Sequence, residues 1–162
     1  MKTDSQRSQI KLLLQIIDEA FDRKAWHGPN LRASLRGITA REAAWRPARG
    51  RHNIWEIAVH AAYWKYAVRR RILRGKRGSF PLKGSNWFAR PKTLDEKTWR
   101  EDVNLLTDEH ARMRDAVARL SDAALSKRTG KGKTCLATLV YGVALHDVYH
   151  AGQIQLLKRL QK

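Results

Sequence analysis

Residues 53–74 read NIWEIAVHAAYWKYAVRRRILR, and no proline or glycine interrupts them before Gly75. The segment opens with Asn53, a residue type that commonly caps the start of a helix. Its first turns are apolar on nearly every side, a pattern typical of a helix enclosed by neighbours rather than lying on a surface. Its last turns carry four arginines, and cations suit the C-terminal end of a helix. We therefore predict a long, buried inner helix here.

The chain carries further helical segments before and after this one, and these can pack around it. Three more segments carry apolar residues three and four positions apart, the spacing of one helix face: residues 5–23, 95–120 and 134–160. A shorter helix is expected over residues 39–44, where a threonine and a glutamate stand at the two positions of a capping box.

The remaining segments read as connections. Residues 75–92 are rich in Gly, Pro and Ser and also hold aromatic residues, so we predict a long crossover loop pinned by aromatics. Residues 121–133 are polar and glycine-rich and are predicted as a loop. No segment alternates in the manner of a strand. The expected fold is all-α, a four-helix bundle with a long crossover loop and one or more short extra helices, in a single domain over residues 1–162.

The chain is strongly basic, with 33 lysines and arginines against 15 aspartates and glutamates and a formal net charge of +18. Such a balance favours polyanions such as nucleic acid, or an acidic small substrate. The densest positive charge lies in two separate segments, Arg69 to Arg77 and Lys127 to Lys133. In most proteins, however, a charge run is a solvated face.

Other features of the composition bear on the cellular compartment. The single cysteine, Cys135, cannot form an intramolecular disulfide, so nothing requires an oxidising compartment. Residues 1–22 lack the uninterrupted apolar core of a signal peptide, and no stretch approaches the ~18 apolar residues of a membrane span. We expect a cytoplasmic protein with no membrane partner.

Three histidines are the strongest candidates for chemistry. His146 and His150 stand one helical turn apart on an apolar stripe, so both imidazoles face the core and can chelate one metal ion. His60, flanked at helical spacing by apolar residues, also points inward. Three imidazoles can hold a divalent metal and leave a position open to water, as in catalytic zinc sites. A lone histidine in the middle of a helix is more often a core residue with satisfied hydrogen bonds, and three together favour the metal site.

Several other residues are candidates for a role near these three histidines. His110, on the apolar stripe of residues 95–120, is a catalytic candidate as a proton shuttle, an outer hydrogen-bond partner or a fourth ligand, with core packing as the alternative. Gln153, one turn after His150, is a candidate for bonding metal-bound water or substrate. Asp147 lies about 100° round the helix from His146 and is expected to be exposed to solvent.

The segments Asn53–His60 and His146–Gln153, together with Trp45-Arg46-Pro47, resemble the DinB/YfiT-like superfamily of metal-dependent proteins over the whole chain. The resemblance implies a four-helix bundle, commonly dimeric, in which His60, His146 and His150 bind a divalent metal, most often zinc or nickel. Relatives include S-transferases that use the low-molecular-weight thiols bacillithiol or mycothiol, and a mycothiol-dependent isomerase. The resemblance offers no account of the +18 charge.

Two functions from different classes follow. The first is a metal-dependent enzyme, a thiol S-transferase or hydrolase acting on a small electrophilic substrate, in a homodimer. The second is a basic nucleic-acid-associated protein with a structural metal or none. The chain shows no helix-turn-helix, zinc-finger or RNA-binding motif, so nucleic acid is the less favoured partner.

Overall fold

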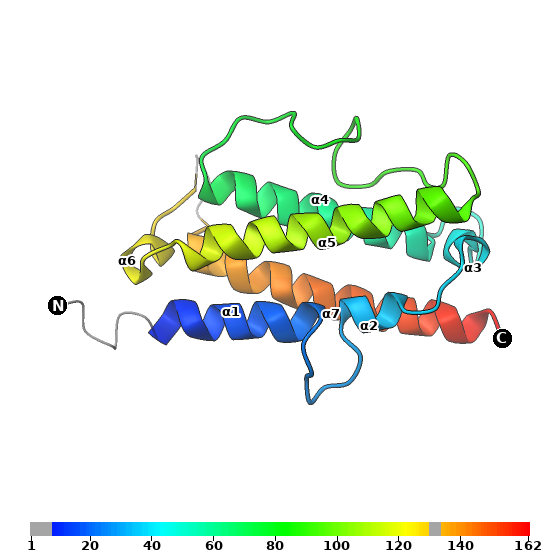
Figure 1. Cartoon of the computed structure of the whole chain (residues 1–162), viewed down its shortest axis with the longest axis horizontal. Coiled ribbons are helices and arrows are strands. Elements are labelled where there is room, and N and C mark those ends of the chain that lie inside the picture. The colour runs from blue at the N-terminus through cyan, green and yellow to red at the C-terminus, as the bar shows by residue number, and fades with distance from the viewer. Residues whose placement is uncertain (1–7, 130–133) are drawn as a thin grey trace.

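The computed structural model describes residues 8–129 and 134–162, and it is all-helical over these ranges (Figure 1). The long helices are α1 (Ser8–Phe21), α4 (Ile54–Ile72), α5 (Glu96–Ala118) and α7 (Leu136–Leu160). The short helices are α2 (Leu31–Leu35) and α3 (Ala40–Ala44), toward one end of the bundle, and α6 (Asp122–Leu125) at the other. No strand occurs in these ranges, which confirms the predicted fold class.

Side-chain caps mark where four of the helices, α2, α3, α4 and α5, begin. Asn53 Oδ1 accepts from the Glu56 amide at 2.7 Å, and a Glu56 carboxylate oxygen accepts from the Asn53 amide at 3.4 Å, which completes a capping box at the start of α4. The predicted capping box of Thr39 and Glu42 is also present at the start of α3. The predicted boundaries of the long helices are confirmed to within a few residues, apart from residues 5–7, which lie outside the described ranges.

The crossover between α4 and α5 gives the bundle its topology. The two helices run side by side in the same direction, and the chain returns along them through the long loop that Figure 1 shows over the top of the molecule. A buried hydrogen bond joins them, because Trp55 Nε1 donates to Asp102 Oδ2 at 2.6 Å. α4 is enclosed as predicted: every side chain from Ile54 to Ala62 is buried. No helix in the described part of the chain is long and apolar enough to cross a bilayer.

Two short helices were not predicted individually. α2 begins after Asn30, whose side-chain oxygen accepts from the Ala33 amide at 2.9 Å, and it lies against α7, where Gln155 Nε2 donates to the Ser34 hydroxyl at 3.2 Å. α6 interrupts the predicted loop over residues 121–133, of which residues 130–133 lie outside the described ranges. Both helices are too short to show periodicity in the sequence, and α2 is stabilised by packing rather than by propensity.

Candidate metal centre

His60 on α4 and His146 and His150 on α7 come together in the interior of the bundle. The Nε2 atom of His146 lies 3.0 Å from His60 Nε2 and 3.0 Å from His150 Nε2. One ring nitrogen from each of the three residues lies within 4.8 Å of the others. His60 and His150 are buried and His146 is half-buried. The fold therefore assembles the three histidines singled out in the sequence, although 86 residues separate His60 from His146.

The opposite nitrogens of two of these rings are held by hydrogen bonds. His60 Nδ1 lies 2.8 Å from the Asn86 carbonyl oxygen, and His150 Nδ1 lies 2.7 Å from Gln153 Oε1. A carbonyl oxygen can only accept, so in both rings Nδ1 carries the proton and Nε2 presents its lone pair to the centre. This arrangement, with the other ring nitrogen donating to an oxygen, is the usual one for a metal-binding histidine.

Burial keeps the three rings neutral. It lowers the pKa of His146 to about 3 and that of His150 to about 4, with the neighbouring histidines adding to the effect. Burial also lowers the pKa of His60, opposed by its hydrogen bond to Asn86. Neutral imidazole is the form that binds a metal, so no proton has to leave at neutral pH.

The donor set fits a divalent ion. A tetrahedral zinc ion with Zn–N distances of about 2.0–2.1 Å places its ligand nitrogens about 3.3 Å apart. The two Nε2 separations of 3.0 Å are close to that spacing. The Nε2 lone pairs of His60 and His150 both face His146 Nε2, and lone pairs facing one another at such distances repel unless a proton or a cation lies between them. In the described residues the buried His146 Nδ1 has no hydrogen-bond partner, so only His60 and His150 have a fixed tautomer.

The crossover loop supplies contacts that the sequence did not identify. The Trp87 ring stacks on His60 at 3.8 Å on one side and on His52 at 3.6 Å on the other. Asn86 adopts a positive φ of 65°, and its side-chain oxygen accepts from Trp64 Nε1 at 2.9 Å while its carbonyl holds His60. The only indication in the sequence was the aromatic content of residues 75–92, which predicted a pinned loop but not its partner.

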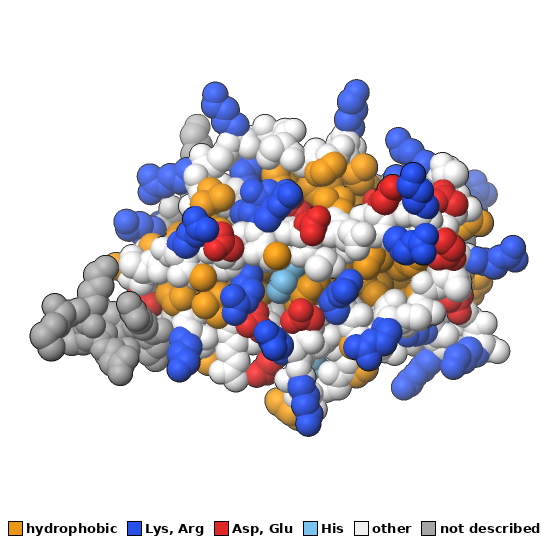
Figure 2. Space-filling model, in the orientation of Figure 1, with side chains coloured by type: hydrophobic (Ala, Val, Ile, Leu, Met, Phe, Trp, Pro, Cys, Tyr) orange, Lys and Arg blue, Asp and Glu red, His pale blue; other side chains and the backbone are white. Residues whose placement is uncertain are grey.

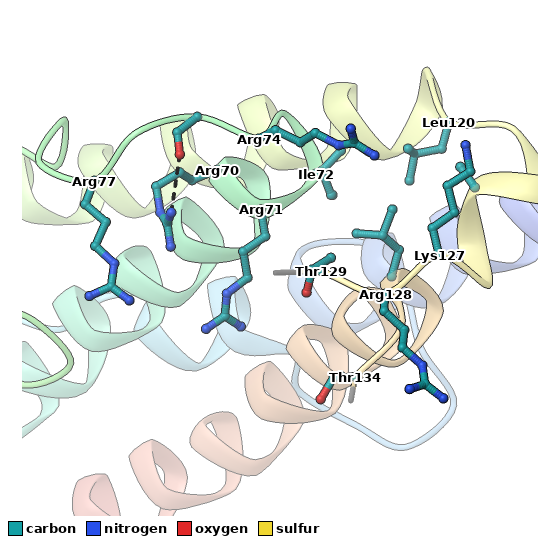
Figure 3. A pocket seen from close by; sticks show the side chains of 13 residues that line it. Arg70, Arg71, Ile72, Arg74, Arg77, Leu120, Lys127, Arg128, Thr129 and Thr134 are labelled. Atoms are coloured by element: carbon teal, nitrogen blue, oxygen red, sulfur yellow. Dashed lines mark hydrogen bonds between the residues drawn. The ribbon is translucent and has the colours of Figure 1, made fainter. Parts of the chain in front are cut away.

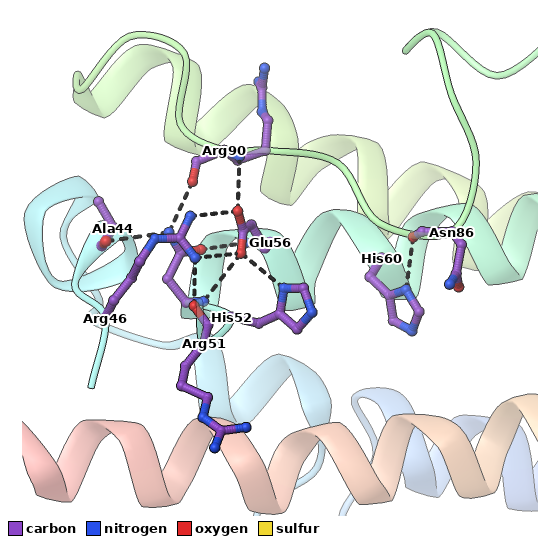
Figure 4. A network of polar contacts seen from close by, with 9 residues as sticks. Ala44, Arg46, Arg51, His52, Glu56, His60, Asn86 and Arg90 are labelled. Carbon is purple, nitrogen blue, oxygen red and sulfur yellow. Dashed lines mark hydrogen bonds and ion pairs between the residues drawn. The ribbon is translucent and has the colours of Figure 1, made fainter. Parts of the chain in front are cut away.

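A polar network fixes the loop to the start of α4 (Figure 4). Glu56 accepts from Arg46 Nη1 at 2.8 Å, lies 3.0 Å from His52 Nδ1 and accepts from the Arg90 backbone amide at 3.4 Å. Burial raises the pKa of Glu56, but the hydrogen bonds from Arg46, His52 and Arg90 outweigh burial and leave the pKa lowered. The carboxylate is thus ionised and joins the segment before α4, through Arg46 and His52, to the end of the crossover loop at Arg90.

His110 lies outside the three-histidine group. Its ring stacks on Phe21 of α1 at 3.6 Å, and burial lowers its pKa to about 2, helped by Lys65 and Arg114. The environment of His110 is therefore that of a packed core residue. No described contact between His110 and the three-histidine group supports a role as fourth ligand or proton shuttle. Gln153 contacts His150 on its Nδ1 side, away from the centre, and its Nε2 donates to the hydroxyl of the exposed Tyr149 at 3.0 Å. The predicted bond from Gln153 to metal-bound water or substrate stays a prediction.

The prediction that Asp147 is exposed was wrong. Its side chain is 1% exposed and forms an ion pair with Lys65 Nζ, which is fully buried on α4. α7 packs against both α1 and α4, so the side of the helix about 100° from His146 also faces the interior. Burial raises the pKa of Asp147 and lowers that of Lys65, each opposed by the charge of the other.

Comparisons with known proteins bear on the family to which the chain belongs. Searches of curated proteins and of solved structures found no match. A family model described as the DinB superfamily matches residues 23–154. This range takes in α4, α5 and the three histidines of the site. By the extent of this match, the chain belongs to the DinB superfamily.

Proposed function

We propose that the protein is a metal-dependent enzyme that uses His60, His146 and His150 to hold one divalent ion, zinc or nickel. The observation that carries this proposal is the convergence of three Nε2 atoms, two of them with their lone pairs directed by hydrogen bonds on Nδ1. When bound at such a site, a divalent ion lowers the pKa of a coordinated water or thiol and so supplies a nucleophile near neutral pH.

The reaction class we infer is the transfer of a low-molecular-weight thiol to a small electrophile, or the hydrolysis of such a substrate. Gln153 acts as a positioning residue, because it fixes the tautomer of His150 from the side opposite the centre.

A hollow of about 530 Å³, a volume ordinary for a small-molecule site, borders Trp64, whose ring lies 6.4 Å from that of His60. This hollow is our candidate for substrate entry.

Metal content tests the proposal. The wild type, a His60→Ala/His146→Ala double variant and a His27→Ala control should be incubated with zinc or nickel, desalted and measured by mass spectrometry. His27 is exposed and distant in sequence from the site, so its removal controls for nonspecific binding to histidine. We expect about one metal per chain in the wild type and in the control, and none in the double variant. Equal metal in all three proteins, or none in any of them, would overturn the proposal.

We further propose that the protein is a homodimer joined along α7. Five large apolar side chains on this helix are exposed, and at 100° per residue they lie within about 100° of one another. They are Tyr141, Leu145, Tyr149, Leu156 and Leu160, here called the α7 stripe. Between Leu136 and Leu157 the only charged residue is the buried Asp147. In a chain of charge +18, this uncharged face lets a second copy approach its identical surface with little repulsion.

A further inference from the structure

The two basic segments that are separate in the sequence line one pocket at the α6 end of the bundle (Figure 3). The end of α4 and the loop after it contribute Arg70, Arg71, Arg74 and Arg77, and the segment after α6 contributes Lys127 and Arg128. The cavity has a volume of about 790 Å³, and the three histidines do not line it. Six cationic side chains thus surround one concave site.

These six cations, here called the basic pocket, lack acidic partners. No aspartate or glutamate lines the cavity, and within residues 8–129 and 134–162 none of the six side chains forms an ion pair. The adjacent Arg69 behaves differently, because its guanidinium pairs with Glu109 at 3.0 Å. Like charges gathered in a concavity repel one another, and a bound anion relieves that repulsion.

The start of α7 adds to the positive potential. Thr134 and Leu136 line the cavity, so the N-terminal end of this 25-residue helix borders the same space. The N-cap residue Cys135 makes no capping hydrogen bond through its side chain. The first amide of α7, that of Leu136, donates to the Lys127 carbonyl oxygen at 3.0 Å. This end therefore contributes through the partial positive charge of a helix N-terminus, which favours an anion.

We propose that the basic pocket binds a small molecule that carries a chain of two or three phosphate groups. A single phosphate neutralises too little of this charge, whereas a di- or triphosphate chain presents several charges to guanidinium groups on both walls. The cavity volume lies within the range of small-molecule sites. On the face that Figure 2 shows, lysine and arginine are scattered among acidic and apolar side chains, without the continuous track that a nucleic-acid backbone requires.

Calorimetric titration with inorganic tripolyphosphate tests the proposal. The pocket variant is Lys127→Gln/Arg128→Gln, whose residues are exposed and border this cavity but not the hollow beside Trp64. The control is Arg41→Gln/Arg100→Gln, which removes the same charge from exposed sites on α3 and α5. We expect one tripolyphosphate per wild-type chain, at least tenfold weaker binding in the pocket variant, and less than twofold weaker binding in the control. Orthophosphate should bind at least tenfold more weakly than tripolyphosphate.

Three outcomes would overturn the proposal. Equal weakening in the two variants would mean that only net charge matters. Loss of tripolyphosphate binding in a His146→Ala variant, with the pocket variant unaffected, would place the ligand at the histidines. Because the His146→Ala variant lacks a proposed metal ligand, it also separates failure of the phosphate proposal from failure of the proposed metal site. Tighter binding of a 20-nucleotide DNA than of tripolyphosphate, with a stoichiometry that grows with DNA length, would indicate a nucleic-acid surface instead.

Discussion

Lys65 and Asp147 form an ion pair between α4 and α7 with 0% and 1% of their side-chain surface exposed. Burying both charges costs free energy of desolvation. Removing only one partner destabilises the fold further, because the other charge stays buried without a counter-charge. In the sequence, Lys65 stands among apolar and aromatic residues, and no lysine or arginine stands one helical turn from Asp147. Each residue therefore depends on the other for its place in the core.

We expect Lys65→Met to lower the free energy of unfolding by about 3–5 kcal/mol, because Asp147 stays buried without its cation. The double variant Lys65→Met/Asp147→Leu should recover most of this loss. Urea unfolding followed by circular dichroism measures both. Lys97→Met, which removes an exposed partner of Glu101, is the control and should change stability by less than about 0.5 kcal/mol. A loss below 1 kcal/mol in Lys65→Met would contradict a structural role for the pair.

His110 makes a prediction about pH. Its pKa is about 2 in the folded protein, against an ordinary value of 6.5, because burial and the nearby Lys65 and Arg114 disfavour its protonation. The unfolded chain therefore binds a proton at His110 below pH 6.5 that the folded chain does not, and stability falls as the pH drops. At about 1.4 kcal/mol per pH unit, His110 costs about 2 kcal/mol at pH 5.

The variant His110→Phe keeps an aromatic ring against Phe21 and removes the titrating group. Its loss of stability between pH 7 and pH 5 should be about 2 kcal/mol smaller than in the wild type, measured on metal-free protein by urea unfolding. His60, His146 and His150 titrate in both proteins, so the comparison isolates His110. An identical loss in the two proteins would show that His110 is not buried as a neutral ring.

At the scale of elements, the crossover loop between α4 and α5 forms one wall of the candidate metal centre. Trp87 fills the space between His52 and His60, and the Asn86 carbonyl holds the His60 ring from its Nδ1 side. The loop is fastened independently of this contact, because Arg90 and Asn53 connect it to the start of α4. The orientation of His60 thus depends on a segment with no regular secondary structure.

Trp87→Ala should weaken zinc binding about tenfold, because outer contacts of this kind orient a ligand without touching the metal. Competition with a chromogenic chelator measures the affinity, and circular dichroism checks that the helices are intact. Trp26→Ala is a suitable control, since its side chain is 96% exposed. Equal zinc affinity in the wild type and Trp87→Ala would mean that the stacked loop does not orient His60.

For the whole molecule, the α7 stripe predicts the oligomeric state. Sedimentation at micromolar concentration should give the mass of a dimer for the wild type and of a monomer for Leu145→Lys/Leu156→Lys, because two lysines on each copy place like charges across a symmetric interface. Leu94→Lys introduces a lysine at a site of similar exposure outside the stripe and should stay dimeric. A wild type that sediments as a monomer at 100 μM, or a Leu94→Lys variant that dissociates equally, would contradict the α7 interface.

The sequence by itself determined the parts of this protein that depend on near neighbours. Asn53 and Glu56, or Thr39 and Glu42, are three residues apart and cap helices wherever those helices lie. Apolar spacing predicted three of the four long helices, and an uninterrupted, almost wholly apolar segment predicted the fourth. The single turn between His146 and His150 placed two rings on one face. Short helices such as α2 were missed, because five residues show too little of a period.

Only the tertiary structure decided which distant residues meet. His60 reaches His146 across 86 residues of sequence, Lys65 reaches Asp147 across 82, and Asn86 reaches His60 across 26. The basic pocket likewise exists only because the end of α4 lies beside the start of α7. Such contacts depend on how helices pack and where loops return, and a local pattern specifies which face of a helix is buried without specifying the residue that it meets.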